Sequence, residues 1–448
     1  MRSGVSPEGL RYAVRQSGRA VAYCALSIGC GTRDEAGYPA GIAHFVEHTL
    51  FRGTRRKSAA VINGYLDKLG GELNAYTTKE EIVLHATVLK EDLGKAARLL
   101  FELATEATFP DREVETERGV VLDEIISYKD NPAEDVYDRF EGLLFAGSPL
   151  STPILGTAAS VKKITPEMLR LFVAERFTPD RMVLSIVADI DEAKLEKQVL
   201  KWFHAIFSLE ADAFPGPIKT ADGPENASAS GTQTNPVTPG QCPAPPGPSA
   251  VYSGPGGAGY CPMNEPFNKV IDKRHHEVNA VIGCRAPSLY EMPDRLVCAM
   301  LANILGGPAS NSLLNKELRE KRGWVYGIES SYTQYADTGI LAISFGCDRP
   351  NLDACLSAIH SILNRLKDNP FTDNQLKAYR KQLLGQLAIS SESGEAQCLS
   401  MGKSMLAWGE ILSPAETRRL LEAVTPAQLQ AIAHRLFGPT SLSSLIYL

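Results

Sequence analysis

Residues 44–48, with the sequence His-Phe-Val-Glu-His, bring together side-chain types that bind and use a metal ion. If this segment is helical, His44 and His48 are four residues apart and project from one face, about one turn apart. Two neutral imidazoles at that spacing can share a tetrahedral Zn²⁺ ion. Glu47 lies beside the metal, where its carboxylate can take a proton from a water molecule whose pKa the metal lowers. The pattern therefore indicates a hydrolytic zinc site.

A competing interpretation is a helix that merely carries two surface histidines and a glutamate. The neighbouring residues are otherwise apolar, and they include Ile42, Phe45 and Leu50. Both histidines would then lie at a buried margin, where imidazole and carboxylate groups without partners are costly. A metal ion supplies that partner, so the apolar setting favours a ligand pair.

A catalytic zinc site needs a third protein ligand and one open position. Chemistry alone leaves six carboxylates open: Glu80, Glu81, Glu102, Glu117, Asp123 and Glu124. A helix predicted over residues 111–128 has an apolar stripe, and Glu117 and Glu124 lie seven residues apart beside it. Two helical turns separate them, so both are candidates to reach one buried site. A solvated helix face is the other interpretation of the same pattern.

The 44–48 pattern, followed 76 residues after His48 by Glu124, resembles the inverted zinc-binding motif of the pitrilysin-type metallopeptidases, His-x-x-Glu-His. Further matches are Gly-Thr-Arg-Asp-Glu at 31–35, Leu-Phe-Arg-Gly-Thr at 50–54 and Gly-Gly-Glu-Leu-Asn-Ala-Tyr-Thr at 70–77. The resemblance extends from about residue 6 to the carboxyl terminus, apart from a Pro/Gly-rich stretch. In length the chain is most similar to the two-domain bacterial members related to mitochondrial processing peptidase.

The resemblance implies a role for seven residues of the first half. They are the zinc ligands His44, His48 and Glu124, the general base Glu47, the supporting carboxylate Glu117, and the strand residues Asn74 and Ala75. The last two would belong to an edge strand along which an extended peptide adds by main-chain pairing. Backbone pairing tolerates varied side chains, so the implied substrates are peptides of mixed sequence.

The second half of the chain carries a further match at residues 318–326, Leu-Arg-Glu-Lys-Arg-Gly-Trp-Val-Tyr. It resembles the Arg/Tyr element of the same family, with Arg319 and Tyr326 seven residues apart. The resemblance implies that these side chains bind the substrate backbone and stabilise the oxyanion of the tetrahedral intermediate. Alone, the segment would be interpreted as an exposed basic loop with a packing tyrosine. Beside the first-half motif, the functional interpretation is favoured.

The quaternary structure follows from the same resemblance. In this family four homologous domains form a clamshell, with the zinc domain of one half facing the last domain of the other. A chain with two domains must pair to complete that chamber. We therefore expect a homodimer in which Arg319 and Tyr326 act in trans, or else a heterodimer with a homologous chain.

The elements that must hold these residues repeat along the chain. Each half begins with a strand pattern ending in Gly-Cys, continues through a helical segment and a strand with a Tyr-Thr pair, and ends with a long amphipathic helix and an apolar strand. This repeated order predicts an α+β fold of two homologous domains, each a mostly antiparallel sheet covered by helices. The second half has no counterpart of the 44–48 pattern, and Tyr379 and Gln386 replace the two carboxylates of the 111–128 helix. Any metal chemistry therefore belongs to the first domain.

Residues 212–262 separate the two halves and contain 11 Pro and 9 Gly. Such a composition cannot bury enough apolar surface to offset the entropy cost of ordering. We expect a catalytic zinc-binding domain at 1–210, a long flexible linker or insertion at 211–265, and a homologous domain without zinc at 266–448 that carries the Arg/Tyr element. Cys242 and Cys261 lie in the linker and could pair under oxidising conditions, but two free thiols are the favoured interpretation.

Composition argues against several other classes of protein. The net charge of -6 and the pI near 5.9 disfavour a nucleic-acid or anionic-membrane surface. Residues 1–18 lack the apolar core of a signal peptide, and the apolar run at 21–28 is too short to span a membrane. Nine cysteines, an odd number with scattered spacings, fit reduced and buried thiols. We therefore expect a cytoplasmic protein that binds neither nucleic acid nor membrane.

Together these patterns predict a zinc-dependent endopeptidase that hydrolyses short or unfolded peptides inside a closed chamber. The main alternative is a non-catalytic subunit that builds the chamber for an active homologous partner. Such subunits tend to lose a ligand or the base, and here all are present. A metal-storage module is the other alternative, and it would need neither Glu47 nor the Arg/Tyr element.

Overall fold

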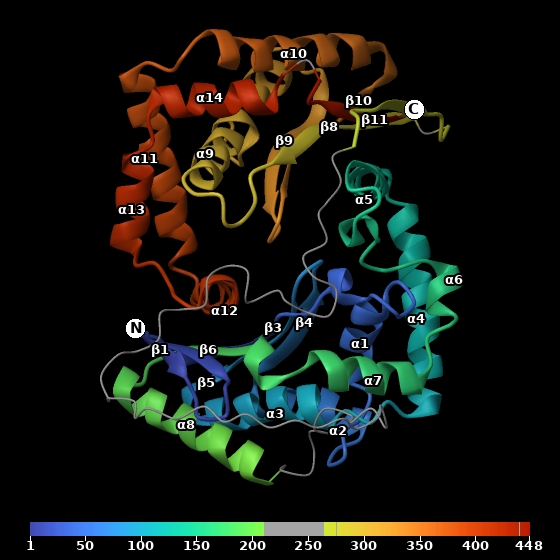
Figure 1. The fold of residues 1–448 in the computed structure, drawn as a ribbon, viewed down its shortest axis with the longest axis vertical. Coiled ribbons are helices and arrows are strands. Elements are labelled where there is room, and N and C mark those ends of the chain that lie inside the picture. The colour runs from blue at the N-terminus through green and yellow to red at the C-terminus, as the bar shows by residue number, and fades with distance from the viewer. Residues whose placement is uncertain (210–263, 275, 439) are drawn as a thin grey trace, which may run out of the picture.

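The computed structural model describes residues 1–209, 264–274, 276–438 and 440–448. Two separate sheets with helices packed against them form the framework (Figure 1). The first has the order β1-β2-β6-β3-β5-β4 and the second the order β7-β11-β8-β10-β9. Each is antiparallel apart from one parallel pair, β2 with β6 and β7 with β11. The prediction of an α+β fold with two mostly antiparallel sheets is confirmed.

The first sheet and its strands come from the amino-terminal half: β1 (Arg2–Val5), β2 (Arg11–Gln16), β3 (Val21–Ile28), β4 (Glu72–Thr77), β5 (Ile82–Leu89) and β6 (Met182–Ala188). The helices of this half are α1 (Ile42–Leu50), α2 (Ala59–Asn63), α3 (Leu93–Glu106), α4 (Asp111–Lys129), α5 (Pro132–Leu144), α6 (Ala158–Val161), α7 (Pro166–Arg176) and α8 (Glu192–Leu209).

The second sheet comes from the carboxyl-terminal half: β7 (Asn268–Ile271), β8 (Glu277–Ala286), β9 (Val325–Gln334), β10 (Gly339–Asp348) and β11 (Ser443–Tyr447). Its helices are α9 (Asp294–Gly306), α10 (Leu352–Asp368), α11 (Asp373–Ser390), α12 (Gly394–Trp408), α13 (Pro414–Glu422) and α14 (Pro426–Leu436). A short π-helical turn over Asn315–Glu320 precedes β9.

The two halves exchange one helix each. Strand β6 is buried at every residue, so both faces of the first sheet are covered. On one of them lies α12 of the second half, whose Cys398, Met401 and Met405 pack against β3 and β6 (Figure 1). In return α5 of the first half packs against β8 and β11 of the second sheet through Val136 and Phe140. Each half therefore supplies part of the core of the other.

A buried ion-pair network joins the halves near the end of β4. The guanidinium of Arg33 contacts both carboxylate oxygens of Asp337, at 2.8 and 2.5 Å, and Glu80 Oε1 at 2.6 Å. Asp337 lies in the β9–β10 turn, and the Ala336 N–H of the same turn donates to Glu80 at 3.0 Å. Charge-assisted, bidentate contacts of this kind define one relative position of two surfaces.

Replacing Asp337 with Asn is expected to weaken the contact between the halves. Arg33 has only 11 % of its side chain exposed, so loss of its bidentate partner leaves a buried charge with one carboxylate instead of two. We expect a loss of about 2 kcal/mol in the free energy of unfolding, measured as a lower urea midpoint. Asp353→Asn, at an exposed position of α10, is the control, and equal midpoints for the two variants would contradict the prediction.

Several expectations concern residues outside the described ranges or stay predictions. The flexible linker at 211–265 falls almost entirely on such residues, as do Cys242 and Cys261, and the domain limits at 210 and 266 remain predictions. The seven described cysteines are all buried and unpaired. Within the described ranges no helix is both long and apolar enough to cross a lipid bilayer.

Candidate metal centre

Helix α1 holds the two histidines on its inner side. Its apolar residues Ile42, Phe45 and Leu50 are fully buried in the core of the first half. His44 is 5 % exposed, and its ring centroid lies 4.5 Å from that of His48, one helical turn further on. The core contacts of the helix therefore aim both imidazoles at one point.

Helix α4 packs on α1 and brings Glu124 to the same point. Glu124 Oε2 lies 3.6 Å from His44 Nε2 and 3.3 Å from His48 Nε2. One ligand atom from each of these three residues lies within 4.8 Å of the other two. Ligands about 2.0–2.1 Å from a tetrahedral zinc are about 3.3 Å apart, so the arrangement fits that metal.

The other five candidates for the third ligand are engaged elsewhere or point away. Glu80 pairs with Arg33, Glu81 lines a separate cavity with Lys403, Glu102 accepts from Thr54, and Asp123 is exposed. Glu117 approaches the cluster from outside: its Oε1 lies 3.0 Å from His48 Nδ1. Among the described residues, the only cluster with metal-binding geometry is that of His44, His48 and Glu124.

Glu117 supports His48 and is itself paired. It is 2 % exposed, and its second oxygen lies 2.5 Å from Arg52 Nε. A carboxylate on the far nitrogen of a metal-binding histidine sets the tautomer and orientation of the ring. Arg52 was not among the residues assigned a role from the sequence, although its position four residues after His48 could have indicated it.

Charge around the cluster favours a cation. Burial acts to lower the pKa of His48, but the carboxylates of Glu124, Glu117 and Glu47 outweigh it and raise the pKa to about 9. Burial and the neighbouring His48 lower the pKa of His44 to about 4. Carboxylates that favour a proton on one imidazole also favour a metal cation between the two, and His44 is in the neutral form that a metal needs.

Glu47 lies beside the ligands without belonging to them. Its Oε2 is 4.0 Å from His44 Nε2, and 13 % of its side chain is exposed. Burial raises its pKa above the ordinary value for a glutamate. A carboxylate with a raised pKa next to a metal cluster is suited to accept and return a proton near neutral pH.

The cluster opens onto a cavity of about 860 Å³. Its lining includes the two histidines, Glu47 and Glu124, the end of β4 from Ala75 to Thr77, and one face of α5. Strand β4 is at the edge of its sheet, and β5 is its only hydrogen-bonded neighbour among the described strands. Ala75 lies on the cavity wall, whereas Asn74 is exposed and does not line the cavity.

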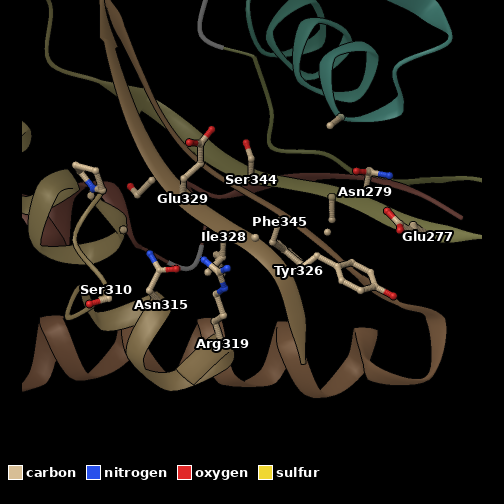
Figure 2. Close-up of a pocket in the computed structure, with 18 of the residues that line it drawn as sticks. Glu277, Asn279, Ser310, Asn315, Arg319, Tyr326, Ile328, Glu329, Ser344 and Phe345 are labelled. Atoms are coloured by element: carbon tan, nitrogen blue, oxygen red, sulfur yellow. The ribbon is translucent and has the colours of Figure 1, made fainter. Parts of the chain in front are cut away.

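Arg319 and Tyr326 lie in a different cavity, of about 630 Å³, in the second half. In Figure 2 the Arg319 side chain rises from the π-helical turn into this cavity, while the Tyr326 ring extends away from Arg319. The Tyr326 hydroxyl donates to Asp348 at 2.7 Å, and the residue is 54 % exposed. Helix α5 lies between the cavities, since Val136 lines this one and other α5 residues line the metal cavity. The two predicted groups of site residues therefore do not meet within one chain.

Glu117→Gln is expected to weaken zinc binding by about 10–100-fold, because the amide cannot hold the His48 tautomer as a carboxylate does. Zinc affinity measured by competition with a chromophoric chelator checks this. Glu115→Gln, an exposed position on the same helix, is the control and should bind zinc as the wild type does. Equal affinities for the two variants would mean that Glu117 has no influence on the ligand.

The fold consists of two α+β halves, and in the first half a carboxylate from a second helix converges with the two histidines of the His-x-x-Glu-His helix. The model described as Insulinase (Peptidase family M16) matches residues 11–158, and that described as Peptidase M16 inactive domain matches residues 163–383. The chain belongs to this pitrilysin-like M16 family. The inactive-domain match covers most of the second half, where the structure has no metal cluster among its described residues.

Bacterial relatives agree with this assignment. An uncharacterized zinc protease YmxG of Bacillus subtilis is 29 % identical, with 94 % of this chain and 91 % of the relative covered. An uncharacterized zinc protease of Streptomyces coelicolor is 27 % identical, with 93 % and 82 % covered. The family and these relatives imply Zn²⁺ as the metal cofactor.

Two solved structures share the fold. A protease from Helicobacter pylori superposes with a TM-score of 0.81 at 19 % identity, over 100 % of this chain and 99 % of that one. A peptidase M16 inactive domain from Pseudomonas fluorescens gives a TM-score of 0.79, also at 19 % identity, over 100 % and 97 %.

Proposed function

We propose that this chain is a zinc-dependent endopeptidase that hydrolyses internal bonds of short or unfolded peptides. The observation that supports it best is the position of Glu47, which lies beside three converging ligand atoms on the wall of a large cavity. A storage site would not need a buried carboxylate next to the ligands. A peptidase needs one as its general base.

Each residue then has a defined task. His44, His48 and Glu124 hold Zn²⁺, which when bound polarises the scissile carbonyl and lowers the pKa of water. Glu47 takes a proton from the attacking water and gives it to the leaving amine. The free edge of β4, next to Ala75, pairs with the main chain of an extended peptide. This pairing places the scissile bond in the metal cavity.

We further propose that two chains complete the active site. Arg319 and Tyr326 line a cavity that α5 separates from the metal, so they act on a substrate held by the partner chain. The preferred assembly is a homodimer, because this sequence contains both groups of residues. A heterodimer with a homologous chain is the other arrangement that the same geometry allows.

The buried, unpaired thiols fit a reducing compartment, so we place the activity in the cytoplasm.

Metal analysis combined with cleavage of an internally quenched fluorogenic peptide tests the function. We expect one zinc per chain, loss of cleavage after treatment with a chelator, and recovery when zinc is returned. A chain that binds zinc but cleaves no peptide under any condition would instead be a non-catalytic subunit of a larger peptidase. A chain that holds no zinc would overturn the proposal altogether.

A further inference from the structure

Helix α1 begins without a capping side chain of its own. Its N-cap residue is Gly41, in the left-handed region with φ +88°, and no side chain of the cap accepts a hydrogen bond from the first turn. The first N–H groups of a helix have no partner within the helix and need one from elsewhere. His44 lies within this first turn, so the partner also affects a metal ligand.

Glu35 supplies the missing partner. Its Oε1 accepts from Ala43 N at 3.0 Å and from Gly41 N at 3.1 Å, while Oε2 accepts from Gly41 N at 3.0 Å. The side chain is almost fully buried, with 6 % of the residue exposed.

The segment that carries Glu35 is fixed by the two residues that precede it. Asp34 accepts from Arg181 at 2.7 Å and from Gly31 N at 3.1 Å, and Arg33 is held by the ion pairs to Asp337 and Glu80. Glu35 therefore projects from a rigid support that spans both halves of the molecule.

Close backbone contacts prevent the helix start from shifting. A Cβ at Gly41 would lie 2.7 Å from the carbonyl oxygen of Leu155, and one at Gly156 would lie 2.3 Å from that of Ala40. Ser160 Oγ also donates to the Ala40 carbonyl at 2.7 Å. No ordinary N-cap side chain fits at Gly41, so the acceptor must come from outside the helix, and Glu35 supplies it.

The two histidines differ in how they are oriented. Glu117 contacts the far nitrogen of His48, whereas His44 Nδ1 is buried and has no hydrogen-bond partner in the described part of the chain. The position of His44 therefore depends on the backbone of the first turn. That backbone is what Glu35 holds.

We propose that Glu35 is a positioning residue of the metal centre, which acts on His44 through the amino-terminal turn of α1. This rests on the proposed assignment of His44 as a ligand. Contacts that orient a metal ligand without touching the metal are worth about 10–100-fold in metal affinity. Glu35 gives the same support through a helix terminus instead of through the imidazole nitrogen.

The test compares zinc affinity and the visible spectrum of the cobalt-substituted protein for three full-length variants. Glu35→Ala removes every acceptor, and we expect zinc affinity to fall by about 10–100-fold with a changed cobalt spectrum. Glu35→Gln keeps the shape and one oxygen, but its NH₂ group faces the Gly41 N–H, so we expect a loss of about 10-fold. Glu106→Gln, a buried carboxylate paired with Arg56 away from the metal, is the control and should stay within about twofold.

The outcomes separate the two proposals. If Glu35→Ala does not fold, Glu35→Gln alone decides, with its fold checked by circular dichroism. Wild-type zinc affinity and cobalt spectrum in a folded Glu35 variant would overturn the role of Glu35. His44→Ala serves as the reference: if it binds zinc as tightly as the wild type, the ligand assignment itself is wrong.

Discussion

Glu47→Gln is expected to lower kcat for peptide hydrolysis by about 10²–10⁴-fold while zinc content stays at one per chain. The amide has nearly the same shape as the carboxylate, so the cavity and the ligands are preserved. It cannot accept a proton at neutral pH, so water is no longer activated by the protein. Glu47 is 4.0 Å from the nearest imidazole nitrogen and is not needed to hold the metal.

Steady-state kinetics with the fluorogenic peptide and zinc analysis on the same sample check this result. Glu115→Gln on the exposed face of α4 is the matched control and should retain wild-type kcat. Two results would count against the role of Glu47. One is a variant that cleaves at the wild-type rate, and the other is a variant that is inactive only because it has lost its zinc.

Co-expressing Glu47→Gln chains with Tyr326→Phe chains is expected to recover about a quarter of the wild-type activity, although each variant alone is nearly inactive. Loss of one oxyanion donor costs about 10²–10³-fold in kcat, so the Tyr326→Phe homodimer is a weak enzyme. If the sites are shared between chains, each mixed dimer has one site with an intact metal half and an intact Arg/Tyr half. Random pairing makes about half of the dimers mixed, and half of their sites are intact.

Two different affinity tags allow the mixed dimer to be purified and measured alone, where about half of the wild-type activity is expected. If the purified mixed dimer showed no recovered peptidase activity, each chain would be using its own Tyr326. A fully active monomer in analytical ultracentrifugation would remove the need for a second chain. Co-expression of Glu47→Gln with His44→Ala is the control, because both lesions lie in the metal half and no mixed dimer then has an intact metal half, so no activity should be recovered.

The sequence by itself predicted the ligand pair, because the relation between His44 and His48 is local. Positions four apart on a helix always share a face, so no knowledge of the rest of the molecule was needed. The repeated order of strands and helices also predicted two similar α+β halves, since the periodicity of each element is visible along the chain. Arg52 could have been found in the same way from its spacing after His48.

The third ligand was different. Six carboxylates satisfied the chemical requirements of a third ligand. The spacing of Glu117 and Glu124 made both of them candidates, but it was equally consistent with a solvated helix face. Only the packing of α4 on α1 separates them, with Glu124 between the imidazoles and Glu117 behind His48. The resemblance to a peptidase family named Glu124, but the residues alone did not.

Tertiary structure alone decided three further features. They are the exchange of α5 and α12 between the halves, the separation of Arg319 and Tyr326 from the metal cavity, and the contact of Glu35 with the start of α1. Local spacing carries no information about such contacts, because they depend on how whole elements pack. The 44–48 pattern therefore determined the proposed metal ligands of α1, and the packing around it determined which residues lie beside, support and hold that site.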